Sequence, residues 1–175
     1  MHIIDKNVTA AGILPYAVKD NKLYLLCGIN HKGEYTDLGG KRDEGESIIE
    51  CAAREFYEES VGLVMSYKKL LQIEIEDTIV IKSDKVKQYV CYITEIECMP
   101  KLNEKYQKKL EYIKKHDVKK RNDIKSVNYN INKLEKLKYY PHDFFELNGL
   151  EFIELDKLRK SKLSYRLNNL LKHVY

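Results

Sequence analysis

Three glutamates in the first half of the chain have a spacing that could support chemistry. Glu55, Glu58 and Glu59 stand at positions i, i+3 and i+4, which lie on one face of an α-helix. Carboxylates held this close together repel one another, so a cation should compensate them. Hard oxygen ligands of this kind suit Mg²⁺ or Mn²⁺. The spacing therefore indicates a divalent-cation site.

The surrounding residues predict the helix that would carry these glutamates. Ser47 and Glu50 have the spacing of a capping box at the helix start, and Gly62 fits a helix stop. The apolar residues recur at helical spacing on roughly the opposite side, where they can bury against a core. This stripe comprises Ile49, Ala52, Ala53 and Phe56.

Residues on either side of the helix start would shape the site. Gly39 and Gly40 allow the backbone to approach a metal or a phosphate closely. Arg54 stands beside the acids and could orient a carboxylate through a bidentate pair. An acidic helix face alone is more often a solvated surface, but the glycines, Glu46 and Arg54 together favour the metal site.

This stretch resembles the Nudix box of the Nudix hydrolase family, Gly-x5-Glu-x7-Arg-Glu-U-x-Glu-Glu-x-Gly-U, in which U is an apolar residue. Residues 40–63 span the match, which covers about a seventh of the chain. The positions at the family spacing are Gly40, Glu46, Arg54, Glu55, Phe56, Glu58 and Glu59. Two residues, Ser60 and Val61, precede Gly62 where the family has one, and we expect this insertion to loosen the helix end without removing the metal site. Upstream, Tyr35-Thr-Asp-Leu38 stands where the family often has Trp-x-x-Pro.

The resemblance implies a role for most of these side chains. The metal ligands would be the carboxylates of Glu55, Glu58 and Glu59, with help from the carbonyl of Gly39. Arg54 would orient Glu55 and Glu58, and either of these two, or a loop acid, would be the general base in the hydrolysis of a phosphoanhydride bond by metal-activated water.

Further candidates lie outside this ligand set. Glu46 would support the loop or a water molecule, and Glu146 and Glu151 could supply another acid near the last strand. Lys41 and Arg42 are candidates for contacting substrate phosphates, although either could simply be solvated.

Length and composition fit a single domain spanning residues 1–175. Hydrophobic residues make up 43% of the 175 residues, which is typical of a globular protein with one sizeable core. No apolar run approaches the length of a membrane span, and no signal peptide is visible. The four cysteines show no Cys-x-x-Cys spacing and are expected to be buried thiols, in a cytoplasmic protein without a membrane partner.

The remaining patterns predict strands around the helix. We expect strands over 8–18 and 23–29 that form a hairpin, then 70–82, 86–96 and 150–155, and a last helix opened by Asp156 or Ser161. Residues 83–85 have the composition of a turn. Together with the resemblance, this order implies an α/β fold of the Nudix type, an α/β/α sandwich with a mixed sheet.

A Lys-rich insert at about residues 101–140 stands apart from that plan. It contains 13 lysines or arginines and five acidic residues, a net charge of +8, whereas the whole chain carries +4. Leu102, Tyr106, Leu110 and Ile113 have helical spacing, so its first half should be an amphipathic helix. The charge could guide a polyanion such as RNA, with tyrosines stacking on bases, or it could only solvate a surface.

These observations support a nucleotide-type small molecule as the substrate. The leading hypothesis is a divalent-metal-dependent pyrophosphohydrolase that cleaves a nucleoside diphosphate linked to another moiety. The alternatives are removal of the mRNA cap, hydrolysis of an inositol pyrophosphate, and a non-catalytic Nudix module that binds a nucleotide or RNA. Such modules usually lose box glutamates, and this chain keeps them. The sequence does not indicate an oligomeric state.

Overall fold

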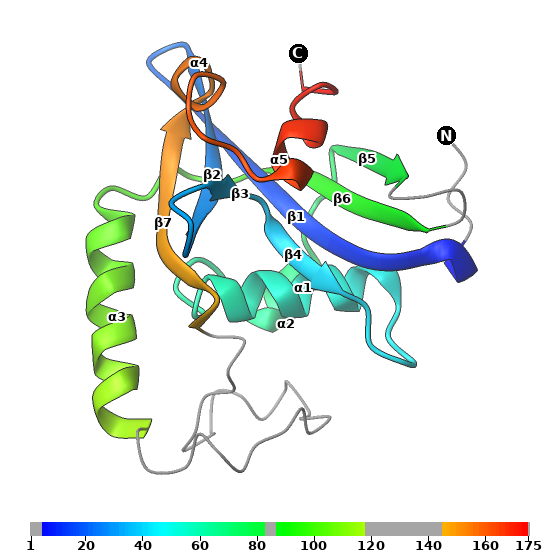
Figure 1. The fold of residues 1–175 in the computed structure, drawn as a ribbon, viewed down its shortest axis with the longest axis horizontal. Coiled ribbons are helices and arrows are strands. Elements are labelled where there is room, and N and C mark those ends of the chain that lie inside the picture. Colours follow the sequence, from blue (N-terminus) through cyan, green and yellow to red (C-terminus); the bar gives the residue numbers. More distant parts are fainter. Residues whose placement is uncertain (1–4, 83–86, 118–144, 175) are drawn as a thin grey trace.

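The computed structural model describes residues 5–82, 87–117 and 145–174. A mixed sheet of seven strands forms the middle layer, with helices on both faces (Figure 1). A short 3-10 helix, η1 (Asp5–Asn7), precedes the sheet. Its strands are β1 (Val8–Lys19), β2 (Lys22–Asn30), β3 (Tyr35–Thr36), β4 (Leu38–Lys41), β5 (Asp77–Lys82), β6 (Gln88–Glu95) and β7 (Leu147–Glu154). The predicted α/β sandwich with a mixed sheet is confirmed.

Strand β1 lies at the centre of this sheet. It pairs in parallel with β6 on one edge; on the other edge it pairs antiparallel with β4 through Ile13 and then with β2 from Tyr16. Pro15 falls between those two antiparallel partners, where its missing N–H leaves no ladder bond unmade. The predicted hairpin is confirmed, and Asp20 and Asn21 close it with positive φ angles, as a type I′ turn requires.

Helices cover the two faces of the sheet. One face carries α1 (Ile48–Glu59), α2 (Tyr67–Leu70) and α3 (Leu102–Asp117), whose predicted apolar stripe is buried. The other face carries α4 (Leu155–Leu158) and α5 (Tyr165–Leu170). Figure 1 shows α1 and α5 on opposite sides of the strands. Among the described helices, none is long and apolar enough to cross a membrane.

Two expectations about these elements are wrong. Residues 70–76 do not form a strand, because the Ser66 side chain caps α2 and the strand starts only at Asp77. The last helix is divided, since Tyr35 forms backbone hydrogen bonds with Lys162 and Ser164 and holds that stretch extended. Ser164, instead of Asp156 or Ser161, then caps α5.

The end of α1 also differs from the expectation of a loosened cap. Val61 N–H donates to the Glu58 carbonyl and Gly62 N–H to the Tyr57 carbonyl, at 3.0 and 2.8 Å. These two bonds are those of a Schellman cap. Val61 takes the left-handed conformation, with φ of 49°, that such a cap usually gives to glycine. The helix therefore ends regularly, and Glu58 and Glu59 stay in its last turn.

Some predictions fall outside the described residues. The expected turn at 83–85 and the part of the Lys-rich insert beyond residue 117 are among them. The described part of that insert is α3, which packs against β7. Cys27, Cys51 and Cys91 are buried free thiols, as expected, and Cys98 is half-buried.

Candidate functional site

Helix α1 begins at the predicted cap. The Ser47 hydroxyl accepts a hydrogen bond from Glu50 N–H, and the Glu50 carboxylate accepts one from Ser47 N–H, so the capping box is complete. Ala52, Ala53 and Phe56 bury the apolar stripe against the sheet. This packing fixes the rotation of the helix and turns Arg54 toward the loop that precedes it.

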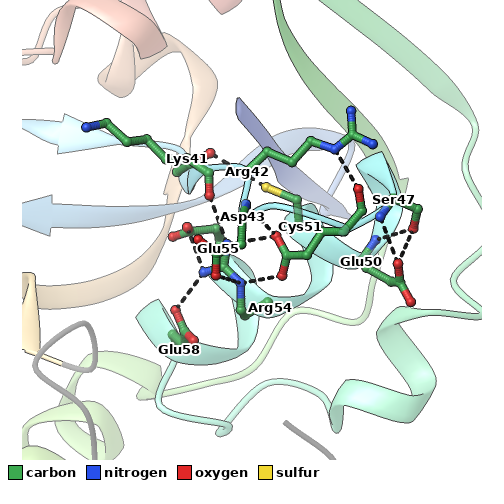
Figure 2. Close-up of polar contacts among 11 residues, drawn as sticks. Lys41, Arg42, Asp43, Ser47, Glu50, Cys51, Arg54, Glu55 and Glu58 are labelled. Atoms are coloured by element: carbon green, nitrogen blue, oxygen red, sulfur yellow. Dashed lines mark hydrogen bonds and ion pairs between the residues drawn. The ribbon is translucent and has the colours of Figure 1, made fainter. Parts of the chain in front are cut away.

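Arg54 is the centre of the acidic cluster (Figure 2). Its Nε and Nη2 donate to the two oxygens of Glu46 at 2.6 and 3.1 Å, and its Nη1 donates to Glu55 and Glu58 at 2.8 and 3.2 Å. Nη2 also donates to the carbonyl of Lys41 at 2.8 Å. One guanidinium therefore hydrogen-bonds to three carboxylates and to the backbone at the end of β4, and it also pairs with Asp43 at 3.8 Å.

Burial strengthens these contacts. The Arg54 side chain is 11% exposed and that of Glu58 is 1% exposed. Burial alone would lower the pKa of Arg54, but the bond to Glu46 and the charges of Glu55 and Glu58 more than offset it, so the pKa is raised. Arg54 thus stays charged, and its single positive charge is shared among several carboxylates.

Glu59 contacts the backbone of the glycine pair in β4. Its Oε2 accepts a hydrogen bond from Gly39 N–H at 2.7 Å. Burial raises the pKa of Glu59 well above its usual range, and Arg166 and the Gly39 N–H act in the opposite direction. A positive charge close to Glu59 would therefore stabilise its ionised form.

The two glycines serve opposite faces of the sheet. A Cβ on Gly40 would lie within 2.6 Å of Glu55 Oε1, so glycine lets this carboxylate rest on the backbone. A Cβ on Gly39 would instead collide with the hydroxyl of Tyr89. Both glycines therefore leave room for a close neighbour, the Glu55 carboxylate at Gly40 and the Tyr89 hydroxyl at Gly39.

Three functional candidates were missed by sequence reasoning: Asp37, Tyr89 and Arg166. Arg166 Nε donates to Asp37 at 2.7 Å, and its Nη2 donates to the carbonyl of Gly39 at 2.6 Å. Tyr89 donates to the other oxygen of Asp37 and places its ring 4.8 Å from the Arg166 guanidinium. The only sequence signal was an acid, Asp37, just before the glycine pair.

The remaining predicted site residues lie elsewhere. Arg42 contacts Asp5 and the Glu46 carbonyl, and its side chain points away from Arg54 in Figure 2. Lys41 is exposed. Glu151 accepts a hydrogen bond from Tyr35 at 2.6 Å.

Glu151 and Glu146 also lie apart from the acidic cluster. Glu151 shares a sheet face with Ile153, which packs on the side of α4 and α5, away from α1. Glu146 is exposed just before β7. The roles of these residues as additional acids stay predictions.

The type of donor in this cluster fits a hard divalent cation. Glu55, Glu58 and Glu59 supply only carboxylate oxygens, within little more than one helical turn. Within the described parts of the chain, no three acidic, histidine or cysteine side chains are already gathered to hold a metal. Binding a cation would thus require these carboxylates to move closer to one another.

Comparison with solved structures identifies the architecture. An Ap4A hydrolase of C. elegans, in a binary complex, superposes with a TM-score of 0.50 at 17% identity, over 93% of this chain and 91% of that one. The chain has the Nudix fold. The NUDIX domain of Shewanella oneidensis NrtR, complexed with ADP ribose, gives a TM-score of 0.52 at 13% identity, over 94% of this chain and 83% of that one. A mutT/nudix family protein from Listeria innocua gives 0.52 at 13% identity, over 97% and 92%.

At these identities the likeness concerns the Nudix fold alone. No protein-family model matches the sequence, and no curated protein matches it either. The box residues named from the sequence nevertheless lie in β4, in the loop after it and in α1 and its C-terminal end.

Proposed function

We propose that this protein is a divalent-cation-dependent pyrophosphohydrolase. It would cleave a nucleoside diphosphate linked to another moiety. The observation that carries this proposal is the cluster in which Arg54 holds Glu46, Glu55 and Glu58 beside the glycine pair of β4, within a Nudix fold. A surface that only solvated its charges would not bury Glu58 and Glu59.

The similar structures support a nucleotide-type substrate. One is named an Ap4A hydrolase and another is described in complex with ADP ribose. Both ligands contain a phosphoanhydride joined to a nucleoside, and the same chemistry is our proposal for this chain.

In this proposal the side chains of the site have two roles, which are to hold a cation and to accept a proton from water. Arg54 fixes the carboxylates of Glu55 and Glu58, and Gly39 N–H fixes that of Glu59. These three carboxylates would hold Mg²⁺ or Mn²⁺, which when bound offsets phosphate charge and lowers the pKa of water. Glu55, whose side chain is 12% exposed against 1% for Glu58, is the better placed to accept a proton from water.

A panel of substrates tests this proposal. Product release would be measured with Mg²⁺ for nucleoside triphosphates, ADP-ribose, a dinucleoside polyphosphate, an inositol pyrophosphate and capped RNA. We expect cleavage of a nucleoside-containing member that a chelator abolishes. Tight binding of one member without cleavage of any would instead favour the non-catalytic module.

Matched variants assign the chemistry to the cluster. Glu55→Gln should lower turnover by on the order of 10²–10⁴-fold with the fold intact, because it removes both a charge and the proton acceptor. Glu44→Gln changes an exposed glutamate in the loop before α1 and should leave turnover unchanged. Equal turnover in the two variants would refute the assignment of Glu55.

RNA cap removal is a second, more specific proposal. Helix α3 buries its apolar stripe and turns lysines outward, which would attract a long anionic substrate. The exposed lysines of α3 with a described side chain are Lys105, Lys108, Lys114 and Lys115, and exposed Lys101 directly precedes the helix. If α3 guides RNA, replacing Lys105 and Lys108 by glutamine should reduce cleavage of capped RNA and its salt dependence, but not cleavage of a dinucleotide. Equal loss on both substrates would refute guidance by α3.

A further inference from the structure

Helix α5 places Arg166 against Gly39 of β4 from the face of the sheet opposite α1 (Figure 1). Leu167 and Leu170 are fully buried and anchor the helix, and the Ser164 side chain caps its start. This anchoring sets the position of Arg166, whose side chain is 30% exposed.

The Arg166 guanidinium is fixed by three kinds of contact. It forms an ion pair with Asp37, which is fully buried, and it lies over the ring of Tyr89. Its Nη2 donates to the Gly39 carbonyl at 2.6 Å, a short and charge-assisted bond. Because Nε and Nη2 belong to one rigid plane, the ion pair with Asp37 and the bond to Gly39 support each other.

Gly39 is consequently held from both sides of the sheet. Its carbonyl accepts from Arg166, and its N–H donates to Glu59 at 2.7 Å. A shift of this residue toward either partner would alter the other contact. Arg166 therefore bears on the position of Glu59 through a single residue, although it comes from the opposite face.

This contact changes what the Gly39 carbonyl can bind. A divalent cation on the same oxygen would stand close to the guanidinium, and like charges at such a separation repel. We propose that Arg166 takes the place of a divalent cation at the Gly39 carbonyl, so that the carboxylates of α1 alone set the cation site. This inference rests on the proposed function and makes Arg166 a positioning residue.

The experiment is an NMR titration of the ¹³C-labelled protein with Mg²⁺. It follows the carboxyl carbons of Glu55 and Glu59, the carbonyl carbon of Gly39, and the Arg166 Nε–H. In the wild-type protein, Mg²⁺ should shift the two carboxyl signals, while the Gly39 carbonyl and the Arg166 Nε–H stay in place. This part of the experiment uses the wild-type protein alone.

Variants of Arg166 then remove the hydrogen bond to the Gly39 carbonyl. In Arg166→Met the Gly39 carbonyl should shift with the same midpoint as the carboxyls, and the Kd for Mg²⁺ should fall by on the order of tenfold. Arg166→Lys keeps a positive charge near buried Asp37, which protects the fold. Lysine cannot donate to Asp37 and to the Gly39 carbonyl from one rigid plane, so the Gly39 carbonyl should respond to Mg²⁺ in this variant too. Lys162→Met removes an exposed charge that contacts Glu34 and should behave as the wild type.

Two results would overturn the inference. One is a wild-type Gly39 carbonyl that shifts together with the carboxyls at the same midpoint. The other is a Gly39 carbonyl that stays silent in both Arg166 variants while the carboxyls respond. If the carboxyl signals of Glu55 and Glu59 do not respond to Mg²⁺ in the wild type or in any variant, the proposed function itself is refuted, and the inference about Arg166 is refuted with it.

Discussion

Replacing Arg54 by methionine should destabilise the metal-free protein by about 3–5 kcal/mol, the range for removing one partner of a buried ion pair. The side chain is 11% exposed and serves three carboxylates. Its hydrogen bonds to charged groups would sum to more, at about 1.5–3 kcal/mol each, but they act as one network and do not add. Glu46 and Glu55, at 18% and 12% exposure, can turn to water, so most of the loss comes from Glu58.

Urea unfolding with a chelator present is the assay, so that no divalent cation replaces the lost charge. The chain has no tryptophan and 14 tyrosines, which makes far-UV circular dichroism and tyrosine fluorescence the suitable probes. Adding Glu58→Gln to Arg54→Met should restore part of the stability, because it removes the uncompensated buried charge. The same substitution in the wild type should destabilise.

A surface arginine provides the control. Arg159 is exposed and donates to the Val174 carbonyl, so Arg159→Met should change the free energy of unfolding by about 0.5 kcal/mol or less. If Arg54→Met cost no more than Arg159→Met, solvent would screen the cluster, and the argument from burial would be wrong.

Two further predictions concern Gly40 in β4 and a half-buried tyrosine, Tyr35. Gly40→Ala would place a methyl group against the Glu55 carboxylate, so turnover should fall by on the order of 10²-fold with little change in unfolding; Glu44→Gln, an exposed change in the loop before α1, should keep its turnover. Burial and the bond to Glu151 raise the pKa of Tyr35 to about 12. Its stabilisation is therefore complete below pH 10 and lost as the pH rises to about 12, so Tyr35→Phe should flatten the fall in stability over that range. If the free energy of unfolding of Tyr35→Phe fell with pH as steeply as that of the wild type over this range, the prediction would be wrong.

The sequence predicted the parts of the molecule that local rules govern. The capping box at Ser47, the apolar stripe of α1 and the stripe of α3 depend on neighbours within two or three turns. The hairpin of β1 and β2 depends on a two-residue turn. In each case the residues that decide the structure are close together in the chain.

Predictions failed where distant contacts decided the structure. The extended stretch before α5 exists because Tyr35 pairs with Lys162 and Ser164, and no local pattern shows that pairing. Arg166 could not be assigned to the site for the same reason, since its partner Asp37 stands 129 residues earlier. Arg54, by contrast, lies within eight residues of Glu46, and its part in the cluster could be predicted.

The same separation has a consequence for the order of folding. Contacts between near neighbours close small loops and form early, whereas those that join distant segments cost more chain entropy and form late. The acidic cluster around Arg54 can assemble as soon as α1 and its preceding loop meet, but Gly39 is held from both sides only when α5 docks. Detachment of α5 alone would release Gly39 while α1 stays folded, so docking of α5 is expected to form a separate cooperative unit.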